Sequence, residues 1–370
     1  MRLLVIAHGG PASGMTRVAV GIADALAEAH DVHVVGAGAA LRGRRWRAHG
    51  HDDVEDPLKR AAAAALAPRL RVDLVLAVGP ADPEIVEAVK RRRPECRAAA
   101  YVPVDGPVHP LERAALSGFD LIVVPTEQAR RHALDAGLPR ARIRVIPHAV
   151  DGSAFHDLGR ARDAKVRVAP DRTAAHDSVW ILNANRNDPR KRLELTLRAF
   201  AHVRRRGHDA WLVLHTGRPP RRLHLGVRVA ELGIADRVIF TSGEDEGDHP
   251  RWSDAALNEL YNACEVGVNT SSREGWGLVA FEHALTGAAQ VITDTPIHRE
   301  IWGDAAVLAG EGATGAALER LVGDPAARRL QAGRARDRAR GRDVDPASVG
   351  RSWRELTARE PTAGALACAS

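Results

Sequence analysis

The feature that most constrains the fold is a repeated alternation of short apolar runs with segments of helical periodicity. The apolar runs are continuous stretches of Val, Ile and Leu, as in Leu74–Val78, and lack the polar alternation of a half-exposed strand. Parallel strands covered by helices on both faces have this composition. The alternation therefore predicts an α/β fold with doubly wound parallel sheets. The expected strands are Leu3–Ala7, Val32–Val35, Leu74–Val78, Ala98–Val102, Leu121–Val124, Ile143–Ile146, Val179–Asn183, Ala210–His215, Val238–Thr241, Val266–Asn269, Gln290–Ile292 and Ala306–Leu308.

The alternation occurs twice, which predicts two Rossmann-like domains. It fades over residues 152–177, which are charged and contain Gly and Pro, so we expect an interdomain linker there. An N-terminal domain at 1–151 and a C-terminal domain at 178–342 are each long enough to bury a core. Residues 343–370 are predicted to form a last helix, about Ala347 to Arg359 and carrying Trp353, and a tail.

Composition excludes several other classes of protein. The net charge is +6, but the basic residues are spread out and not interleaved with aromatic side chains, so we expect no nucleic-acid partner. A weak attraction to anionic lipid headgroups stays open and is not favoured. Cys96, Cys264 and Cys368 lie far apart, as expected for reduced thiols in a cytoplasmic protein. The chain opens on a strand, so we expect no signal peptide, and no apolar run is long enough to span a bilayer.

The most informative motif is the segment from Asn269 to Glu282. A short strand runs into a polar loop that contains glycine, and a helix is expected to begin near Leu278. Such a helix start offers unpaired N–H groups and a positive dipole end to an anion. Two carboxylates, Glu274 and Glu282, stand eight positions apart and can accept hydrogen bonds from sugar hydroxyls. Phosphate and hydroxyls together are the outline of a nucleotide sugar, whereas an acid pair alone also fits a plain helix cap.

Cations gather after the first strand of the second domain, in the segment from Asn183 to Arg192. Arg186 and Lys191 stand in this segment, at the expected start of a helix over Lys191–Arg205. Cations disfavour a helix N-terminus unless an anion is bound there. A third segment, residues 9–17, is a glycine-rich turn after the first strand, and the absence of a G-x-G-x-x-G pattern argues against NAD.

These motifs resemble the retaining GT-B glycosyltransferases of family 4, the glycosyl transferases group 1. The pattern Ser-x-x-Glu-Gly-Trp-Gly-Leu-x-x-x-Glu, residues 271–282, is similar to the donor-binding signature of that family. The spacing of Arg186 and Lys191 matches as well, and the resemblance spans nearly the whole chain. It implies two facing Rossmann-like domains, a cleft between them and a final helix that crosses back to the first domain.

The resemblance also implies roles for individual residues. Glu274 is expected at hydroxyls of the transferred sugar and Glu282 at the ribose, while Arg186 and Lys191 neutralise the diphosphate. The catalytic residues implied are Arg186, Lys191, Glu274 and Asp105. The donor-binding residues implied are Gly10, Asn183, Gly217, Thr241, Gly275, Trp276, Gly277, Leu278, Val279 and Glu282. The residues expected on the acceptor side are Gly9, Ser13, Gly14 and His109.

The function implied is transfer of a sugar from a UDP- or GDP-sugar to an acceptor hydroxyl by a metal-independent, hexosyltransferase-type enzyme. The nucleotide sugar is a co-substrate, and no cofactor is expected. A GT-B nucleotide-sugar epimerase and a non-catalytic basic binding protein remain as alternatives. The sequence leaves open the acceptor, the sugar, the base and the oligomeric state.

Overall fold

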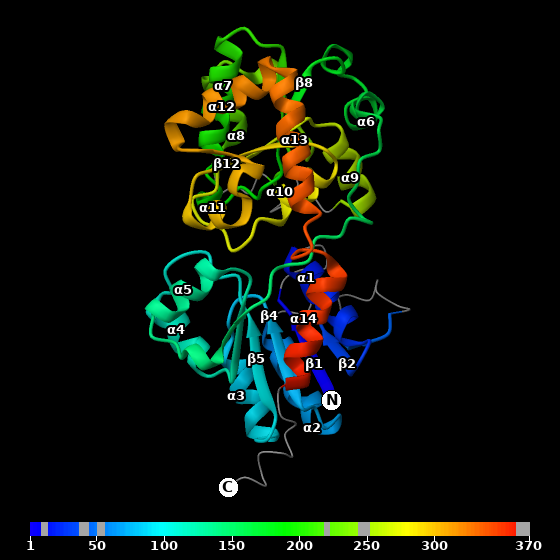
Figure 1. Ribbon diagram of the computed structural model, residues 1–370, viewed down its shortest axis with the longest axis vertical. Coiled ribbons are helices and arrows are strands. Elements are labelled where there is room, and N and C mark those ends of the chain that lie inside the picture. Colours follow the sequence, from blue (N-terminus) through cyan, green and yellow to red (C-terminus); the bar gives the residue numbers. More distant parts are fainter. Residues whose placement is uncertain (9–13, 37–43, 50–55, 218–222, 243–251, 360–370) are drawn as a thin grey trace. The chain divides into compact units, whose positions relative to one another are not determined.

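The computed structural model describes residues 1–8, 14–36, 44–49, 56–217, 223–242 and 252–359. The chain forms two compact units, one of Met1–Ala149 with Arg342–Ser370 and one of Val150–Gly341. Each unit contains one parallel sheet with helices packed on it (Figure 1). The predicted pair of doubly wound, Rossmann-like α/β domains is therefore confirmed. Among the described helices, none is both long enough and apolar enough to cross a membrane.

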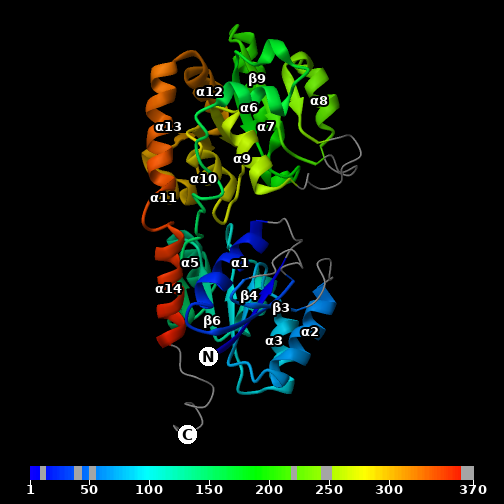
Figure 2. The same ribbon diagram turned by 90° about the vertical axis from the view of Figure 1, so that its right-hand side faces the viewer.

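The sheet of the first unit has seven parallel strands in the order β3-β2-β1-β4-β5-β6-β7. The strand order reverses between β1 and β4, so successive crossovers cover opposite faces. Helices α1 and α14 pack together, and α2 packs against α3 (Figure 2). The strands are β1 Arg2–Ala7, β2 Asp31–Val35, β3 Arg47–His49, β4 Leu74–Val78, β5 Arg97–Tyr101, β6 Leu121–Val124 and β7 Ile143–Val145. The helices are α1 Gly14–Leu26, α2 Asp56–Arg69, α3 Pro83–Arg92, α4 Pro110–Ser117, α5 Glu127–Asp135 and α14 Pro346–Arg359.

The sheet of the second unit has six parallel strands in the order β10-β9-β8-β11-β12-β13, and its order reverses between β8 and β11. Its core is aliphatic, with Leu197, Leu212 and Leu214 fully buried. The strands are β8 Val179–Asn183, β9 Ala210–Leu214, β10 Val238–Phe240, β11 Val266–Asn269, β12 Ala289–Thr293 and β13 Val307–Ala309. The helices are α6 Ala161–Val168, α7 Leu193–Arg205, α8 Leu225–Glu231, α9 Asp254–Asn262, α10 Leu278–Leu285, α11 Pro296–Trp302, α12 Thr314–Gly323 and α13 Pro325–Ala339.

Three segments illustrate how the structure differs from the sequence prediction. Strand β3 was not predicted, because its three residues contain no apolar run. Residues 152–177, expected to be a linker, contain helix α6 and belong to the second unit. That helix packs on α9 and buries Lys165, whose ammonium donates to the carbonyl of Ser178 at 2.7 Å and pairs with Glu265 at 2.5 Å. A helix held by a buried ion pair shows no apolar periodicity in the sequence.

The third difference concerns the start of α7. The predicted helix over Lys191–Arg205 begins only at Leu193, after a 3₁₀ turn over Pro189–Lys191. The residue between the two, Arg192, has a left-handed backbone with φ of 52°. Lys191 therefore does not stand on the α-helix, and the left-handed residue turns the chain between the two helical pieces.

Helix α14 is anchored to the first unit by Trp353. Its indole is buried and meets the Tyr101 ring edge-on, with ring centroids 5.2 Å apart. The Tyr101 hydroxyl donates to the carbonyl of Ile146 at 2.9 Å and accepts from Nδ1 of His148 at 2.7 Å. Burial lowers the pKa of His148 to about 3, which keeps this imidazole neutral. The predicted last helix thus joins the chain's C-terminal segment to the sheet of its first domain.

Replacing Trp353 by Ala should destabilise the first unit by about 3–5 kcal/mol, the usual cost of removing a fully buried aromatic side chain. Denaturant unfolding would measure the effect. Arg351→Ala is the matched control, because Arg351 is exposed on the same helix. Equal stability of the two variants would contradict the anchoring role of Trp353.

Candidate active site

The candidate site lies at the carboxyl ends of β8 and β11, two adjacent central strands of the second unit. From β8 the chain moves to one side of the sheet and from β11 to the other. Loops diverge at such a reversal of strand order, and ligands of doubly wound sheets bind there. Asn183 ends β8 and Asn269 ends β11. The two motifs predicted to hold the donor, residues 183–192 and 269–282, therefore lie side by side.

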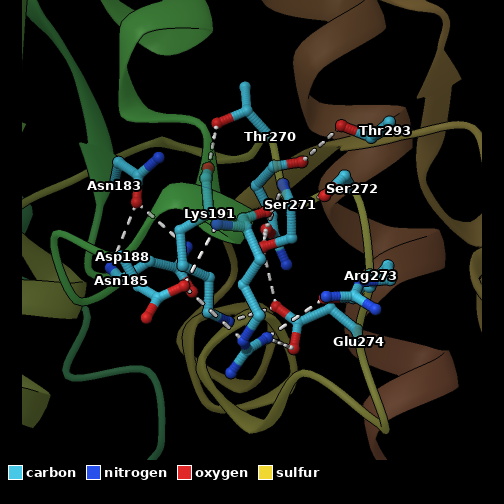
Figure 3. Close-up of polar contacts among 12 residues, drawn as sticks. Asn183, Asn185, Asp188, Lys191, Thr270, Ser271, Ser272, Arg273, Glu274 and Thr293 are labelled. Atoms are coloured by element: carbon cyan, nitrogen blue, oxygen red, sulfur yellow. Dashed lines mark hydrogen bonds and ion pairs between the residues drawn. The ribbon is translucent and has the colours of Figure 1, made fainter. Parts of the chain in front are cut away.

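Asn183 shapes the turn that follows β8 (Figure 3). Its side-chain amide donates to Oγ1 of Thr196 at 2.8 Å, and its Oδ1 accepts from the backbone N–H of Asn185 at 3.1 Å and from the side chain of Asn185 at 2.9 Å. Asn183 is 1% exposed. These bonds fix the direction in which the chain leaves the sheet, while a direct contact of Asn183 with the donor stays a prediction.

The turn carrying Lys191 is built by its own polar groups. The carboxylate of Asp188 caps the 3₁₀ turn by accepting from the backbone N–H of Arg190 at 3.1 Å, and the N–H of Lys191 donates to the carbonyl of Asp188 at 2.9 Å. Pro189 follows the cap, where its missing N–H costs no hydrogen bond. This local folding turns the Lys191 side chain inward, where it is 8% exposed.

The loop after β11 is tied to that turn. Oγ1 of Thr270 donates to the carbonyl of Lys191 at 2.9 Å, and the backbone N–H of Ser272 donates to the carbonyl of Arg190 at 2.8 Å. Ser271 is held within its own loop, because its backbone N–H donates to Oδ1 of Asn269 at 3.1 Å. Two segments distant in sequence are thereby fastened into one site.

The centre of the site is a buried ion pair between Lys191 and Glu274. Nζ of Lys191 bonds directly to Oε1 of Glu274. The same carboxylate oxygen lies 2.8 Å from the hydroxyl of Ser271, and Oε2 accepts from Nη1 of Arg190 at 3.2 Å. Figure 3 shows Lys191, Ser271 and Glu274 converging. The cation predicted for the diphosphate and the carboxylate predicted for the sugar thus hold each other.

Charge and burial oppose each other at this pair. Burial alone would raise the pKa of Glu274, but Lys191 and then Arg190 outweigh it and lower that pKa to about 2. Burial lowers the pKa of Lys191, with Arg190 and Arg186 acting in the same direction, while Glu274 opposes the shift. A dianion bound beside Lys191 would favour its protonated form and relieve the repulsion from the two arginines.

Arg186 is the open cation of the site. It lies in the loop after β8, and its side chain is exposed. Within the described part of the chain, its guanidinium makes no hydrogen bond or ion pair. Arg186 also acts on Lys191, where it adds to the lowering of the Lys191 pKa by burial and by Arg190. The two predicted cations therefore differ, since Arg186 is available to a ligand and Lys191 is already paired.

Helix α10 begins after a glycine, which has no side chain to cap the first backbone N–H groups. Gly277 occupies its N-cap with φ of 92°, a conformation that favours glycine, and no side chain caps the helix. The amides of Leu278 and Val279 lie in the first turn of the helix, and their contact with a diphosphate stays a prediction. Trp276, preceded by buried Gly275, stacks on Phe281 with centroids 5.2 Å apart, so its ring supports the loop from below.

Glu282 lies further along α10, and it too is buried. Its Oε2 accepts a hydrogen bond from the hydroxyl of Tyr261, on α9, at 3.1 Å. The predicted ribose contact of Glu282 remains a prediction, and Tyr261 fixes where that carboxylate stands. Sequence spacing showed no link between these two residues.

Two further donor residues predicted from the sequence lie at the carboxyl ends of β9 and β10. Gly217 is buried just beyond β9. Thr241 follows β10, and its hydroxyl lies 2.7 Å from Nδ1 of His215. Both residues are on the same edge of the sheet as Lys191, so the topology gathers the predicted donor residues of the second unit along one edge.

The residues predicted for the first unit are less fully described. Gly9, Gly10 and Ser13 lie outside the described residues, and Gly14 begins α1. Asp105 is partly buried in the loop after β5. His109 is exposed and caps α4, its Nδ1 accepting from the backbone N–H of Leu111 at 3.3 Å. His109 thus has a local structural role, and its predicted acceptor contact stays a prediction.

Sequence reasoning missed Arg190 and His298 as members of the site. Arg190 adjoins Lys191, and this adjacency was the only available signal. His298, on α11, is buried and donates from Nδ1 to the carbonyl of Thr293 at 2.7 Å. Burial lowers the pKa of His298, against the influence of Glu274.

Across the described residues, no cluster of three or more His, Cys, Asp or Glu side chains could hold a metal ion.

Two family models match the chain, one in each half. "Glycosyltransferase Family 4" matches residues 12–153, and "Glycosyl transferases group 1" matches residues 170–336. Among characterised relatives, a GDP-mannose-dependent alpha-(1-6)-phosphatidylinositol monomannoside mannosyltransferase of Mycolicibacterium smegmatis is 26% identical over 186 residues, 49% of this chain and 47% of that protein. A D-inositol 3-phosphate glycosyltransferase of Acidothermus cellulolyticus is 28% identical over 49% of this chain and 39% of that protein. The chain thus matches less than half the length of these relatives.

Solved structures match over nearly the full chain. Sucrose-phosphate synthase from Thermosynechococcus elongatus superposes with a TM-score of 0.76 at 19% identity, covering 97% of this chain and 100% of that one. The Anabaena protein HepE in complex with UDP-glucose superposes with a TM-score of 0.75 at 15% identity, with the same coverage. At these identities, the likeness establishes the fold.

The left-handed backbone at Arg192 generates a stability prediction. A non-glycine residue in this conformation costs about 1–2 kcal/mol, and glycine adopts it freely. Arg192→Gly should therefore leave the free energy of unfolding unchanged or raise it, although it removes an ion pair with the exposed Glu311. The matched control is Arg198→Gly inside α7, which should cost about 1 kcal/mol. Equal losses in the two variants, measured by denaturant unfolding, would contradict the strain at Arg192.

Proposed function

Because this chain belongs to the GT-B glycosyltransferases of family 4, group 1, we propose that it is a retaining enzyme using a nucleotide-diphosphate sugar. The proposed donor is a UDP- or GDP-sugar, and the proposed acceptor is a hydroxyl group of a small molecule or glycan. The observation that carries the proposal is the cluster of Lys191, Arg190 and Glu274 beside the open Arg186, at the strand-order reversal of the second sheet.

The charges of this cluster suit a diphosphate. Three cations, Arg186, Arg190 and Lys191, face two carboxylates, Glu274 and Asp188. These five groups together carry one excess positive charge before ligand binds, and the N-terminus of α10 adds backbone donors. The dianionic diphosphate of a nucleotide sugar is attracted by this excess of positive charge. The GDP-mannose dependence named for one relative and the UDP-glucose bound in one structural neighbour support this donor class.

Buried carboxylates supply the contacts for hydroxyl groups. Glu274 stays ionised, so it can accept hydrogen bonds from sugar hydroxyls while Lys191 and Ser271 hold it in place. Glu282, held by Tyr261, stands further along α10, where a ribose would follow the diphosphate. Charge-assisted hydrogen bonds of this kind are shorter and stronger than those between neutral groups.

The proposed chemical step needs no dedicated protein base. The acceptor oxygen attacks the anomeric carbon on the face from which the diphosphate leaves, and the bond between that carbon and the phosphate oxygen breaks. The departing phosphate oxygen takes the acceptor proton, so charge and protons balance. Arg186 and Lys191 stabilise the developing negative charge. A fixed cation at such a position typically contributes a factor of about 10² to 10³ in rate.

Ligand binding and product analysis test this function. UDP or GDP at about 100 times its Kd should stabilise the protein by about 2.7 kcal/mol, which a thermal-shift screen of UDP-, GDP- and dTDP-sugars would detect. Incubation of the stabilising sugar without acceptor should give slow hydrolysis. An isomerised nucleotide sugar would instead identify an epimerase, and binding of neither nucleotide would overturn the proposal.

Lys191→Met should lower turnover by about 10²- to 10³-fold, because the leaving diphosphate loses a buried cation. Removing one partner of this buried pair should also lower the melting temperature. The protein should still fold, since Glu274 keeps its bonds from Arg190 and Ser271. Lys165→Met is the matched control, a second buried lysine of the same unit that pairs with Glu265 away from the site. It should lower the melting temperature and leave the turnover of folded enzyme unchanged. Turnover of Lys191→Met at the wild-type level would remove Lys191 from the reaction.

A further inference from the structure

Arg190 bonds to the loop that carries Glu274 through both its side chain and its backbone carbonyl. Nη1 of its guanidinium donates to Oε2 of Glu274 at 3.2 Å and to the carbonyl of Arg273 at 3.1 Å. Its own carbonyl accepts from the backbone N–H of Ser272 at 2.8 Å and from the hydroxyl of Ser272 at 3.2 Å. One residue of the turn thus contacts three consecutive residues of the loop that carries Glu274.

The two oxygens of Glu274 are held by different groups. Oε1 contacts Lys191 and Ser271, and Oε2 contacts Arg190. A diphosphate bound at Lys191 draws the ammonium toward a second anion, which weakens its hold on Oε1. The bond from Arg190 to Oε2 does not depend on Lys191 and can persist during turnover.

We infer that Arg190 is a positioning residue that holds Glu274 against the transferred sugar and thereby sets selectivity for the donor sugar. This inference rests on the function proposed above. The guanidinium suits the task because its donors are fixed in one plane, so it can bond to a carboxylate and a carbonyl together. An ammonium at position 190 would keep the charge and lose this geometry.

A competing role for Arg190 is direct binding of the diphosphate, as a third cation. The two roles differ in which ligand loses affinity when Arg190 is replaced. A diphosphate ligand contributes equally to binding of UDP and of UDP-glucose, since both carry the diphosphate. A residue that positions Glu274 contributes only when the sugar is present.

Calorimetric binding of UDP and UDP-glucose, or of GDP and GDP-mannose if that pair binds, separates the two roles. In Arg190→Met, affinity for the nucleotide sugar should fall by about 10- to 100-fold, as expected for a lost hydrogen bond to a charged group, with the free nucleotide affected less than 3-fold. Arg190→Lys should recover part of the loss. Discrimination between gluco- and manno-configured donors should weaken in the same order. Arg198→Lys, an exposed arginine on α7, is the matched control and should match the wild type.

A double-mutant cycle with Glu274→Gln tests whether Arg190 acts through the carboxylate. If it does, Arg190→Met added to Glu274→Gln should lower affinity for the nucleotide sugar by no more than about 2-fold further. Factors that multiply would show that Arg190 acts independently and would overturn the inference.

Two results in the single variants would also overturn the inference. An equal fall for nucleotide and nucleotide sugar would make Arg190 a diphosphate ligand, and unchanged affinity for both would leave it without a role in donor binding. Failure of the wild type to bind either nucleotide pair is a separate result, because it would overturn the proposed function and this inference with it.

Discussion

The buried contact between Lys191 and Glu274 is the interaction on which the rest of the site depends. It joins residues 83 positions apart and brings the turn after β8 against the loop after β11. Removing two charges from water is costly, and their attraction offsets that cost only with good geometry and additional hydrogen bonds. Ser271 and Arg190 supply those bonds. The arrangement therefore makes more sense as preparation for an anionic ligand than as a source of fold stability.

The topology of the second sheet brings Lys191 and Glu274 together. In the second sheet β8 and β11 are neighbours, although strands β9 and β10 lie between them in the sequence. Both motifs begin at the last residue of a buried strand, so their distance is fixed by the spacing of parallel strands. The caps at Asp188 and Gly277 then set local direction. The strands therefore fix where the site lies, and the short segments that follow them carry its side chains.

Much of this architecture could be predicted from the sequence, for identifiable physical reasons. Strands such as Leu74–Val78 are buried on both faces and therefore show as continuous apolar runs. The α6 helix does not, because one of its buried residues is Lys165, which needs Glu265 from a distant strand end. In the site, local motifs indicated Lys191 and Glu274 separately. Their mutual pairing and the part played by Arg190 are long-range contacts, which one sequence without its fold does not contain.

The position of α14 has a consequence for how the protein is made. Trp353 packs on Tyr101, so the first domain contains a helix that follows the second domain in the sequence, as well as the strands that precede it. The ribosome synthesises the whole second domain after strand β7 of the first sheet and before this helix. During this interval the nascent first domain exposes the surface that α14 later covers. Helix α14 therefore completes a domain whose strands are synthesised before the second domain.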